Sequence, residues 1–448
     1  MTTHILIKNK LNNFNKKIKV SADKSISIRS VLLASQAVGT SKISNLLESD
    51  DVLNSLRVIK KLGINYTKVG KAYYIKGYGL NGFNIRNKTV LNAGNSGTLA
   101  RLILGLLVKS NSKVKLVGDK SLSKRDFSRV IKPLRLFGVN IESKNNLLPL
   151  QIQGTDFLRP IKYDENIGSA QVKTCIIFSA LNTPGITQIN SKISRNHTEL
   201  FLKFLKYPIK VIKKSGKEKI LVEGLQQFNS FKYEVPGDIS SASFFIVLTL
   251  LSKNSKIVIK KVNVNKSRIG IISILNMMGA EIRLKKKTIY NGEEIADIHV
   301  KSKKILSGIN CPSRLNSSAI DEFLIIFLVA AKARGMSRFK DLGEMNKKES
   351  KRLDLAIKFL KLIGIKVDRY QNDIRIHGNP DLNLSNKFEM KNFLKDHRIF
   401  FLCCITALTL GGKWKINDKD SINTSFPDFI KTLRMIGAKI DWEKGRIL

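Results

Sequence analysis

Apolar and polar positions follow one pattern that recurs six times along the chain. In each copy an amphipathic helix ends at Leu-Gly or a similar pair, a short β-branched strand follows, and a polar turn leads to a second short strand. In five copies a glycine stands where a left-handed residue ends the helix. The copies span 56–77, 134–154, 201–224, 274–300, 359–378 and 433–448. Because they recur roughly every 70 to 85 residues, six nearly equal units account for the chain.

The other half of each unit is a strand followed by a largely apolar helix. These helices are predicted over 27–37, 99–108, 170–181, 241–251, 321–333 and 398–410. Helical crossovers between strands predict parallel pairs and an α/β fold. Three units in each of two lobes suit the length better than a solenoid, whose units would be shorter. The turn 235–238 separates the first three units from the last three, so we expect the lobe boundary there and a ligand cleft between the lobes.

The composition adds a strong positive charge to this picture. Lys and Arg number 79 against 35 Asp and Glu, which gives a formal net charge of +44. Such a charge is typical of proteins that bind nucleic acid. Here, however, the basic residues are spread through every segment, and the abundance of Lys, Asn and Ile indicates a genome-wide bias. We therefore expect no nucleic-acid partner and a field that attracts small anionic substrates.

Cysteines and apolar runs indicate the compartment. The four cysteines, Cys175, Cys311, Cys403 and Cys404, show no C-x-x-C spacing, which is typical of reduced, buried thiols. The longest apolar stretches are shorter than the roughly 20 residues of a membrane span. No apolar core of a signal peptide follows the N-terminus. The sequence therefore predicts a cytoplasmic protein without a membrane partner.

Residues 92–102 are the first candidate for chemistry. Gly94 and Gly97 stand between a short apolar strand and an apolar helix, where the backbone can approach a ligand closely. The unpaired N–H groups and the positive end of the helix dipole then favour an anion, and Arg101 adds a charge one turn later. Taken alone, the same residues could form a capped tight turn.

Similar polar segments occur at equivalent places in other units. They are 23–29, 118–125, 168–171 and 194–199, and each combines hydroxyls or amides with cations or a helix start. A single segment of this kind is usually a capped helix on a solvated surface. Several such segments at equivalent places of the repeated units indicate a ligand with two or more acidic groups.

Carboxylates stand out in the second half of the chain. Asp321 and Glu322 begin an otherwise apolar helix, where acids also simply stabilise the helix dipole. Glu349 lies among the cations of 347–352, which would keep it ionised or let it exchange a proton quickly.

His397 lies in the triplet 396–398 at the start of the last apolar helix, where it could carry a proton or make a structural hydrogen bond. The histidines show no metal-ligand spacing, and no Gly-Lys-Ser phosphate loop is present. We expect neither a metal nor another cofactor.

Seven motifs together carry a resemblance to a known family. They are Asp-Lys-Ser-Ile-Ser-x-Arg-Ser at 23–30, Gly-Asn-Ser-Gly-Thr-x-x-Arg at 94–101, Ser-Ala-Gln-Val-Lys at 169–173, Val-Pro-Gly-Asp-Ile-Ser-Ser at 235–241, Ile-Asp-Glu at 320–322, Lys-Glu-Ser-x-Arg at 348–352 and Asp-His-Arg at 396–398. In their order and spacing, the chain resembles the 5-enolpyruvylshikimate-3-phosphate synthase family.

The resemblance implies a two-lobed, inverse α/β barrel-like architecture with three strand–helix units in each lobe and the active site in the cleft between them. One lobe would comprise 1–20 and 237–448, the other 21–236, and the chain would cross twice. The crossing near residue 20 follows from the resemblance alone.

The implied reaction transfers the enolpyruvyl group of phosphoenolpyruvate to the 5-hydroxyl of shikimate 3-phosphate and releases phosphate. By resemblance, Asp321 takes the hydroxyl proton, Glu349 exchanges a proton with the methylene carbon, and Lys24 belongs to the same catalytic set. The expected phosphoenolpyruvate ligands are Lys24, Gly97, Arg125, Gln171, Arg352 and Arg398. The expected shikimate 3-phosphate ligands are Lys24, Ser25, Arg29, Ser169, Ala170 through its backbone, Gln171, Ser194, Asp321 and Lys348. A monomer without a cofactor is expected.

Two other interpretations stay open at this point. The UDP-N-acetylglucosamine enolpyruvyl transferases share fold and donor, but they rely on a loop cysteine in the first half, where this chain has only Cys175 within an apolar run. A non-catalytic protein that binds anions or RNA would also explain the charge, and its binding would weaken steeply with salt.

Overall fold

The chain forms two compact units. The computed structural model describes residues 3–86, 88–391 and 396–444. Unit 1 comprises Met1–Ser21, Gly237–Thr288 and Glu294–Leu448, and unit 2 comprises Ala22–Pro236 and Ile289–Glu293. The chain thus passes between the units after Ser21 and after Pro236, and the short segment Ile289–Glu293 is grouped with unit 2 although it belongs to a hairpin of unit 1.

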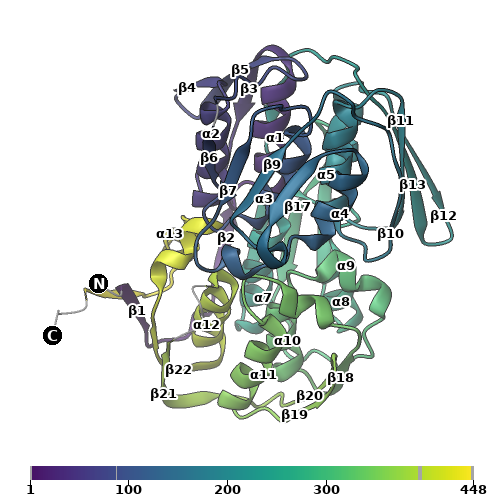
Figure 1. Ribbon diagram of the computed structural model, residues 1–448. Helices are drawn as coiled ribbons and strands as arrows, with labels where there is room; N and C mark the ends of the chain where they lie inside the picture. Colours follow the sequence, from purple (N-terminus) through teal and green to yellow (C-terminus); the bar gives the residue numbers. More distant parts are fainter. Residues whose placement is uncertain (1–2, 87, 392–395, 445–448) are drawn as a thin grey trace. The chain divides into compact units, whose positions relative to one another are not determined.

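Unit 2 surrounds three buried helices with three sheets (Figure 1). The buried helices are α1 (Lys24–Gln36), α3 (Gly97–Leu106) and α5 (Ala170–Leu181). The outer helices are α2 (Asp50–Lys61), α4 (Ser128–Leu136) and α6 (His197–Phe204), with 3-10 turns at Leu122–Lys124 and Lys144–Asn146. The first sheet has the strand order β14 (Lys232–Glu234), β3 (Val38–Ser44), β5 (Ala72–Tyr78) and β4 (Asn65–Val69). The second has the order β6 (Thr89–Asn92), β7 (Val114–Val117), β9 (Leu150–Gln153) and β8 (Asn140–Ser143). The third has the order β10 (Lys162–Glu165), β11 (Ile186–Lys192), β13 (Lys217–Glu223) and β12 (Ile209–Lys214).

Unit 1 repeats this plan with its own core. Its buried helices are α7 (Ile239–Leu251), α10 (Phe323–Lys332) and α12 (His397–Leu410). The others are α8 (Gly270–Met277), α9 (Asn316–Ala319), α11 (Arg352–Leu362) and α13 (Phe429–Ile436), with 3-10 turns at Ser313–Leu315, Gly343–Lys347 and Lys419–Thr424. The sheets are β16 (Ile282–Tyr290), β17 (Glu293–Lys301), β15 (Lys256–Asn263) and β2 (Asn15–Ile18); β18 (Gly335–Phe339), β20 (Asp373–Gly378) and β19 (Val367–Tyr370); β21 (Leu384–Met390), β22 (Gly411–Ile416), β1 (Thr3–Ile7) and β23 (Asp441–Lys444).

Three sheets are completed by strands from distant parts of the sequence. β14 pairs in parallel with β3, and β2 pairs in parallel with β15. β1 lies between β22 and β23 and is antiparallel to both. β1 therefore takes the place that the second strand of the last hairpin was predicted to fill, and residues 445–448 of that prediction lie outside the described residues.

Buried helices explain the six apolar runs of the sequence. Every residue of α10 from Phe323 to Ala331 is buried, and α7 is buried from Ile239 to Leu250. A helix that is apolar on all sides is stable only when other elements cover all its faces. With helices inside and sheets outside, each unit inverts the usual barrel order, and the predicted mixed α/β fold of strand–helix units is confirmed.

The start of α10 corrects one predicted boundary. The sequence placed Asp321 and Glu322 in the first helical turn, but the helix begins at Phe323. Glu322 is the N-cap residue, whose carbonyl accepts hydrogen bonds from the backbone N–H groups of Ile325 (3.1 Å) and Ile326 (3.0 Å). Asp321 therefore lies in the turn between α9 and α10.

The two helices that follow the passages of the chain between the units begin in the same way. Asp23 caps α1 and Asp238 caps α7, each with its side chain accepting a backbone N–H of the first turn. Within unit 2 the Asp23 N–H donates to Pro236 O (2.8 Å), and within unit 1 the Asp238 N–H donates to Ser21 O (2.9 Å). These bonds fix where α1 and its first residue, Lys24, begin.

In the part of the chain that the structure describes, no helix is both long and apolar enough to cross a membrane. Over the same residues, no group of three or more His, Cys, Asp or Glu side chains is placed to hold a metal ion.

Candidate functional site

The start of α3 in unit 2 lies next to two guanidinium groups. Ser96 caps the helix, and Gly97 is its first residue. A methyl group added at Gly97 would lie 2.9 Å from Nη1 of Arg101 and 2.9 Å from Nη1 of Arg125. Because Gly97 has no side chain, two guanidinium groups lie close to this helix N-terminus, a combination that suits an anion.

Neutral groups hold these two arginines. Arg125 donates from Nη2 to Asn95 Oδ1 (2.6 Å), while its buried Nε has no hydrogen-bond partner among the described residues. Arg101 donates from Nη1 to Gln171 Oε1 (3.1 Å), and Gln171 donates from Nε2 to Thr98 Oγ1 (3.0 Å). Gln171 of α5 is thereby connected to the first turn of α3.

The start of α1 contributes two more cations. Lys24 Nζ lies 2.9 Å from Asp51 Oδ2 of α2. Arg29 is buried and donates from Nε to Thr198 Oγ1 (2.8 Å) and from Nη2 to Thr174 Oγ1 (3.0 Å). The elements α1, α5 and α6 thus meet at the Arg29 guanidinium.

Hydroxyls and a backbone turn complete this part of unit 2. Ser169 caps α5 by accepting a hydrogen bond from Val172 N (3.4 Å), so Ala170 is the first helical residue. Ser25 accepts a hydrogen bond on its carbonyl from Arg29 Nη1 (2.9 Å). The Ser194 hydroxyl is buried, and no described residue lies at hydrogen-bond distance from it. A buried hydroxyl without a partner is costly, so a bound ligand would supply what the chain does not.

Arg352 organises the corresponding region of unit 1. Its fully buried guanidinium contacts three carboxylates: Asp396 Oδ2 from Nε (2.9 Å), Glu349 Oε2 from Nη2 (2.5 Å) and Asp321 Oδ1 from Nη1 (3.4 Å). Burial alone would lower the pKa of Arg352, but the charges of Asp396 and Glu349 outweigh burial and raise it. Burial likewise opposes ionisation of Asp396, and Arg352 still lowers the pKa of that carboxyl. The pair is therefore charged in the folded protein.

Asp321 lies between cations at the edge of this cluster. Its side chain is 12% exposed, and its Oδ1 lies 3.3 Å from Lys348 Nζ. Its backbone carbonyl accepts a hydrogen bond from Arg398 Nη1 (2.9 Å). A partly exposed carboxylate held in this way has the geometry of a general base for a substrate hydroxyl.

Glu322 is buried directly behind Asp321. Ser240 donates its hydroxyl to Glu322 Oε1, and Arg268 Nη2 donates to Ser240 Oγ (2.9 Å). Arg398 Nη1 lies 3.8 Å from the same Glu322 oxygen. These contacts connect the starts of α7, α10 and α12 beneath the cluster.

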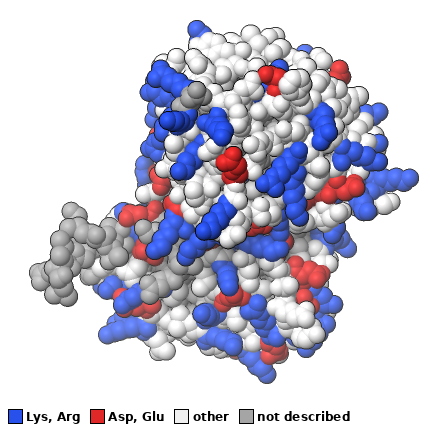
Figure 2. Space-filling view, in the orientation of Figure 1, with Lys and Arg blue, Asp and Glu red and all other residues white. Residues whose placement is uncertain are grey.

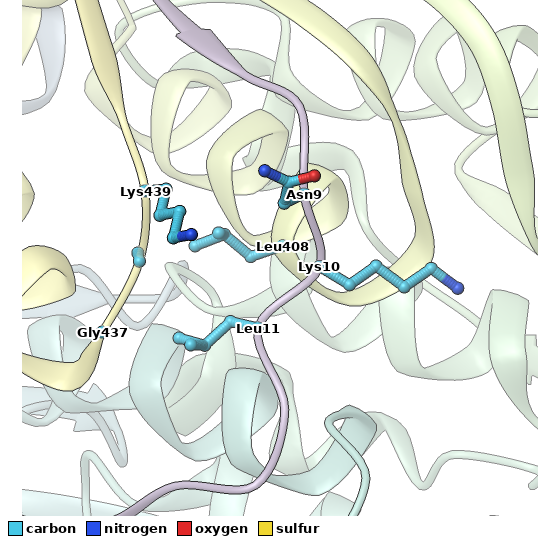
Figure 3. Close-up of a pocket in the computed structure, with 7 residues that line it drawn as sticks. Asn9, Lys10, Leu11, Leu408, Gly437 and Lys439 are labelled. Carbon is cyan, nitrogen blue, oxygen red and sulfur yellow. The ribbon is translucent and has the colours of Figure 1, made fainter.

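A small pocket elsewhere in unit 1 is separate from these residues. It measures about 280 Å³ and is lined by Asn9, Lys10, Leu11, Leu408, Gly437, Ala438 and Lys439 (Figure 3). Leu408 lies ten residues after Arg398 on α12, which is about 15 Å along a helix. Lys439 points toward Leu408, whereas Lys10 extends away from it. No predicted site residue lines this pocket.

Comparisons with known proteins now decide the family. The model of the EPSP synthase (3-phosphoshikimate 1-carboxyvinyltransferase) family matches residues 8–433. A 3-phosphoshikimate 1-carboxyvinyltransferase from Ruthia magnifica subsp. Calyptogena magnifica is 40% identical over 95% of this chain and 96% of its own. The chain belongs to the EPSP synthase family.

Solved structures agree with this assignment. EPSP synthase from Acinetobacter baumannii has a TM-score of 0.86 and 32% identity, and the match covers 99% of this chain and 100% of that one. An enolpyruvyl transferase from Streptomyces tendae, at 13% identity, matches with a TM-score of 0.78 over 100% of both chains, which supports the fold alone.

The structure distributes the predicted EPSP synthase residues over both units. In unit 1, direct contacts join Asp321, Lys348, Glu349, Arg352 and Arg398. In unit 2, Gly97 adjoins Arg125, and Ser25 adjoins Arg29; Gln171 is linked to the Gly97 helix through Arg101 and Thr98. Lys24 contacts Asp51, Ser169 and Ala170 begin α5, and Ser194 lies buried on the loop before α6.

Several side chains that hold these residues were not predicted. Thr174 and Thr198 hold Arg29, and Asn95 holds Arg125. Asn95 lies in the 94–101 motif, Thr174 directly follows the 169–173 motif, and Thr198 lies in the polar segment 194–199. Nothing in these linear patterns says which hydroxyl or amide meets which arginine. On the visible face, Lys and Arg are spread among Asp and Glu (Figure 2), so surface charge does not mark the site either.

Proposed function

We propose that the chain transfers the enolpyruvyl group of phosphoenolpyruvate to the 5-hydroxyl of shikimate 3-phosphate and releases phosphate, in the pathway to chorismate and the aromatic amino acids. The observation that carries this proposal is the family match over residues 8–433, which includes all the residues assigned to the chemistry. The cations around Gly97 and the carboxylates around Arg352 are groups that this reaction requires.

The cations of unit 2 would bind the anionic parts of both substrates. Lys24, Gly97, Arg125 and Gln171 are proposed for phosphoenolpyruvate, together with Arg352 and Arg398 of unit 1. Lys24, Ser25, Arg29, Ser169, Ala170, Gln171 and Ser194 are proposed for shikimate 3-phosphate, together with Asp321 and Lys348. Two anions repel each other, so fixed cations lower the barrier by positioning them and by stabilising developing charge.

The carboxylates of unit 1 would move protons. Asp321 accepts the proton of the 5-hydroxyl, whose oxygen forms a bond to the carbon that carries the phosphate. Glu349 delivers a proton to the methylene carbon, which becomes a methyl group in a tetrahedral intermediate. When the C–O bond to phosphate breaks, a methyl proton returns to Glu349 and the enol double bond forms again. Arg352 contacts both of these carboxylates, and Lys348 contacts Asp321.

The wider description of the protein follows the same proposal. We propose that units 1 and 2 are the two lobes predicted as 1–20 with 237–448 and as 21–236, and that both act on one pair of substrates. The protein works as a cytoplasmic monomer on small molecules, with no cofactor, nucleic acid or membrane.

Cys175 does not support the alternative of a UDP-N-acetylglucosamine enolpyruvyl transferase, which would use a cysteine. This thiol is fully buried in α5, and burial raises its pKa to about 12. Reactive cysteines are thiolates that are at least partly exposed, so Cys175 is suited to packing rather than to catalysis.

The test measures phosphate released from phosphoenolpyruvate with shikimate 3-phosphate, with UDP-N-acetylglucosamine and with neither. We expect release only with shikimate 3-phosphate. Asp321→Asn should lower kcat by about 10²–10⁴-fold, the usual contribution of a general base. Asp368→Asn, in the same unit and paired with His377 at the surface, is the matched control and should keep normal turnover. Normal turnover in Asp321→Asn would refute the base assignment, and release with UDP-N-acetylglucosamine alone would refute the acceptor.

A further inference from the structure

The last residue of the 169–173 motif is charged but has no part in the proposed chemistry. Lys173 is completely buried within α5, and its Nζ lies 2.6 Å from Glu199 Oε1 and 2.5 Å from Glu218 Oε1. Burial alone would lower the pKa of Lys173, but the two carboxylates outweigh burial and raise it. The molecule thus keeps a charged ammonium group inside unit 2, which needs a reason because buried charges are costly.

The two carboxylates belong to elements on either side of one loop. Glu199 lies in the first turn of α6, directly after the loop 193–196. Ser191, the last residue but one of β11, donates its hydroxyl to Glu218 Oε1 (3.1 Å). One end of the loop is therefore tied to Lys173 through Glu199, and the other through Glu218.

A second contact, next to the Lys173–Glu199 ion pair, prevents α5 and α6 from sliding past each other. Thr174 follows Lys173 on α5, and Thr198 precedes Glu199 on α6; their hydroxyls lie 2.7 Å apart. Both hydroxyls also accept hydrogen bonds from Arg29. Two adjacent pairs, one ionic and one neutral, thus fix α6 against α5.

The loop that is tied in this way carries Ser194. Its hydroxyl is buried and has no hydrogen-bond partner among the described residues. A single hydroxyl can reach a ligand oxygen only over a narrow range of distances, so the loop has to be held to within about half an ångström.

We propose that Lys173 is a positioning residue for shikimate 3-phosphate: by holding both ends of the 193–196 loop, it sets where the Ser194 hydroxyl meets the substrate, without touching the substrate itself. This inference rests on the proposed function, since it takes Ser194 as a ligand of shikimate 3-phosphate.

A purely structural role for Lys173 makes a different prediction. Removing one member of a buried ion network usually costs about 3–5 kcal/mol, whereas replacing every member with uncharged groups of similar size is often neutral. If Lys173 only stabilises unit 2, the triple variant Lys173→Met, Glu199→Gln, Glu218→Gln should recover both stability and substrate affinity. If Lys173 positions Ser194, the triple variant should recover stability and still bind shikimate 3-phosphate poorly.

The experiment measures KM for each substrate in Lys173→Met, in the triple variant and in Ser191→Ala, which removes the tie at the β11 end alone. Lys60→Met, at an exposed lysine of α2, is the control and should match the parent enzyme. In the triple variant we expect KM for shikimate 3-phosphate to rise at least tenfold, with KM for phosphoenolpyruvate changed less than twofold. Ser191→Ala should raise the same KM about threefold.

Stability is followed separately through Cys175. It is the only cysteine of unit 2 and is fully buried in α5, so its labelling rate by a thiol reagent reports opening of that unit. A triple variant with normal labelling and normal KM for shikimate 3-phosphate would overturn the inference. If Lys173→Met and the triple variant both fail to fold, an unchanged KM in Ser191→Ala overturns it. A parent enzyme without turnover would instead refute the proposed function.

Discussion

Arginines in the two units are held by chemically different partners. In unit 2, Arg125 donates to the amide oxygen of Asn95. In unit 1, Arg352 contacts the carboxylates of Asp396 and Glu349 as well as Asp321. A neutral partner orients a guanidinium group and leaves its charge available to a ligand, whereas a carboxylate cancels that charge.

Among the residues proposed to bind the substrates, the same contrast extends to Arg29 and Lys348, and Lys24 departs from it. Arg29 of unit 2 donates to two threonine hydroxyls, and Lys348 of unit 1 contacts a carboxylate. Lys24 differs from the others in unit 2, because it lies 2.9 Å from Asp51. Under the proposed function, unit 2 supplies the arginines that have neutral partners, whereas unit 1 supplies the carboxylates that accept and donate protons and adds Lys348, Arg352 and Arg398 to the substrate ligands.

The largest effect should come from Arg352→Met. The change leaves the fully buried Asp396 without its charged partner, and breaking a buried ion pair in this way costs about 3–5 kcal/mol. We expect unit 1 to unfold at much lower denaturant concentration and turnover to be lost. Both tryptophans, Trp414 and Trp442, lie in unit 1, so tryptophan fluorescence measures this unfolding directly.

The matched variant in unit 2 is Arg125→Met. Its partner Asn95 is neutral and partly exposed, so we expect a loss of about 1 kcal/mol or less in the free energy of unfolding. Binding of phosphoenolpyruvate should nevertheless fall strongly. Equal destabilisation by Arg125→Met and Arg352→Met would contradict the contrast between the units.

At low pH, the Arg352–Asp396 pair should stabilise unit 1 less. Because Arg352 lowers the pKa of the Asp396 carboxyl, the pair stabilises the fold at pH values above about 4, the ordinary pKa of Asp, and loses that contribution as pH falls through the lower folded value. Asp396→Asn should therefore lower the free energy of unfolding by about 1.5–3 kcal/mol at pH 7. The gap between variant and parent, measured by tryptophan fluorescence in denaturant titrations, should narrow below pH 4. A gap that stays constant down to pH 3 would show that the charge of Asp396 is not what matters.

Helices were easier to predict than the contacts between them. The predicted range 170–181 equals α5, because Ser169 provides a capping hydroxyl and the residues that follow are apolar on every side. The predicted helix from Asp321 begins two residues too early, since acids before an apolar run are equally typical of a first turn and of the residues before it.

Strand pairing was much harder to predict. β1 completes a sheet with β22 and β23, more than 400 residues away in the sequence. A strand of five residues has too short a hydrophobic pattern to predict its pairing partner. Which strands pair depends on how the whole chain folds. The sequence likewise pointed to Arg29 and Ser194, but Thr174 and Lys173 lie on α5 and Thr198 lies on α6, and these helices meet only in the folded unit.

The smallest change, Gly97→Ala, tests whether the charge of unit 2 is really available. The new methyl group would lie 2.9 Å from Nη1 of both Arg101 and Arg125, and these are ends of flexible side chains that can move aside. We expect the free energy of unfolding to change by less than about 0.5 kcal/mol, while KM for phosphoenolpyruvate rises about tenfold, equivalent to about 1.4 kcal/mol. Gly343→Ala is the control, because its methyl group would meet the neutral Asn372 amide at 3.0 Å. A normal KM for phosphoenolpyruvate in both variants would mean that these guanidinium groups do not bind it. The contrast between the units would then not matter for function.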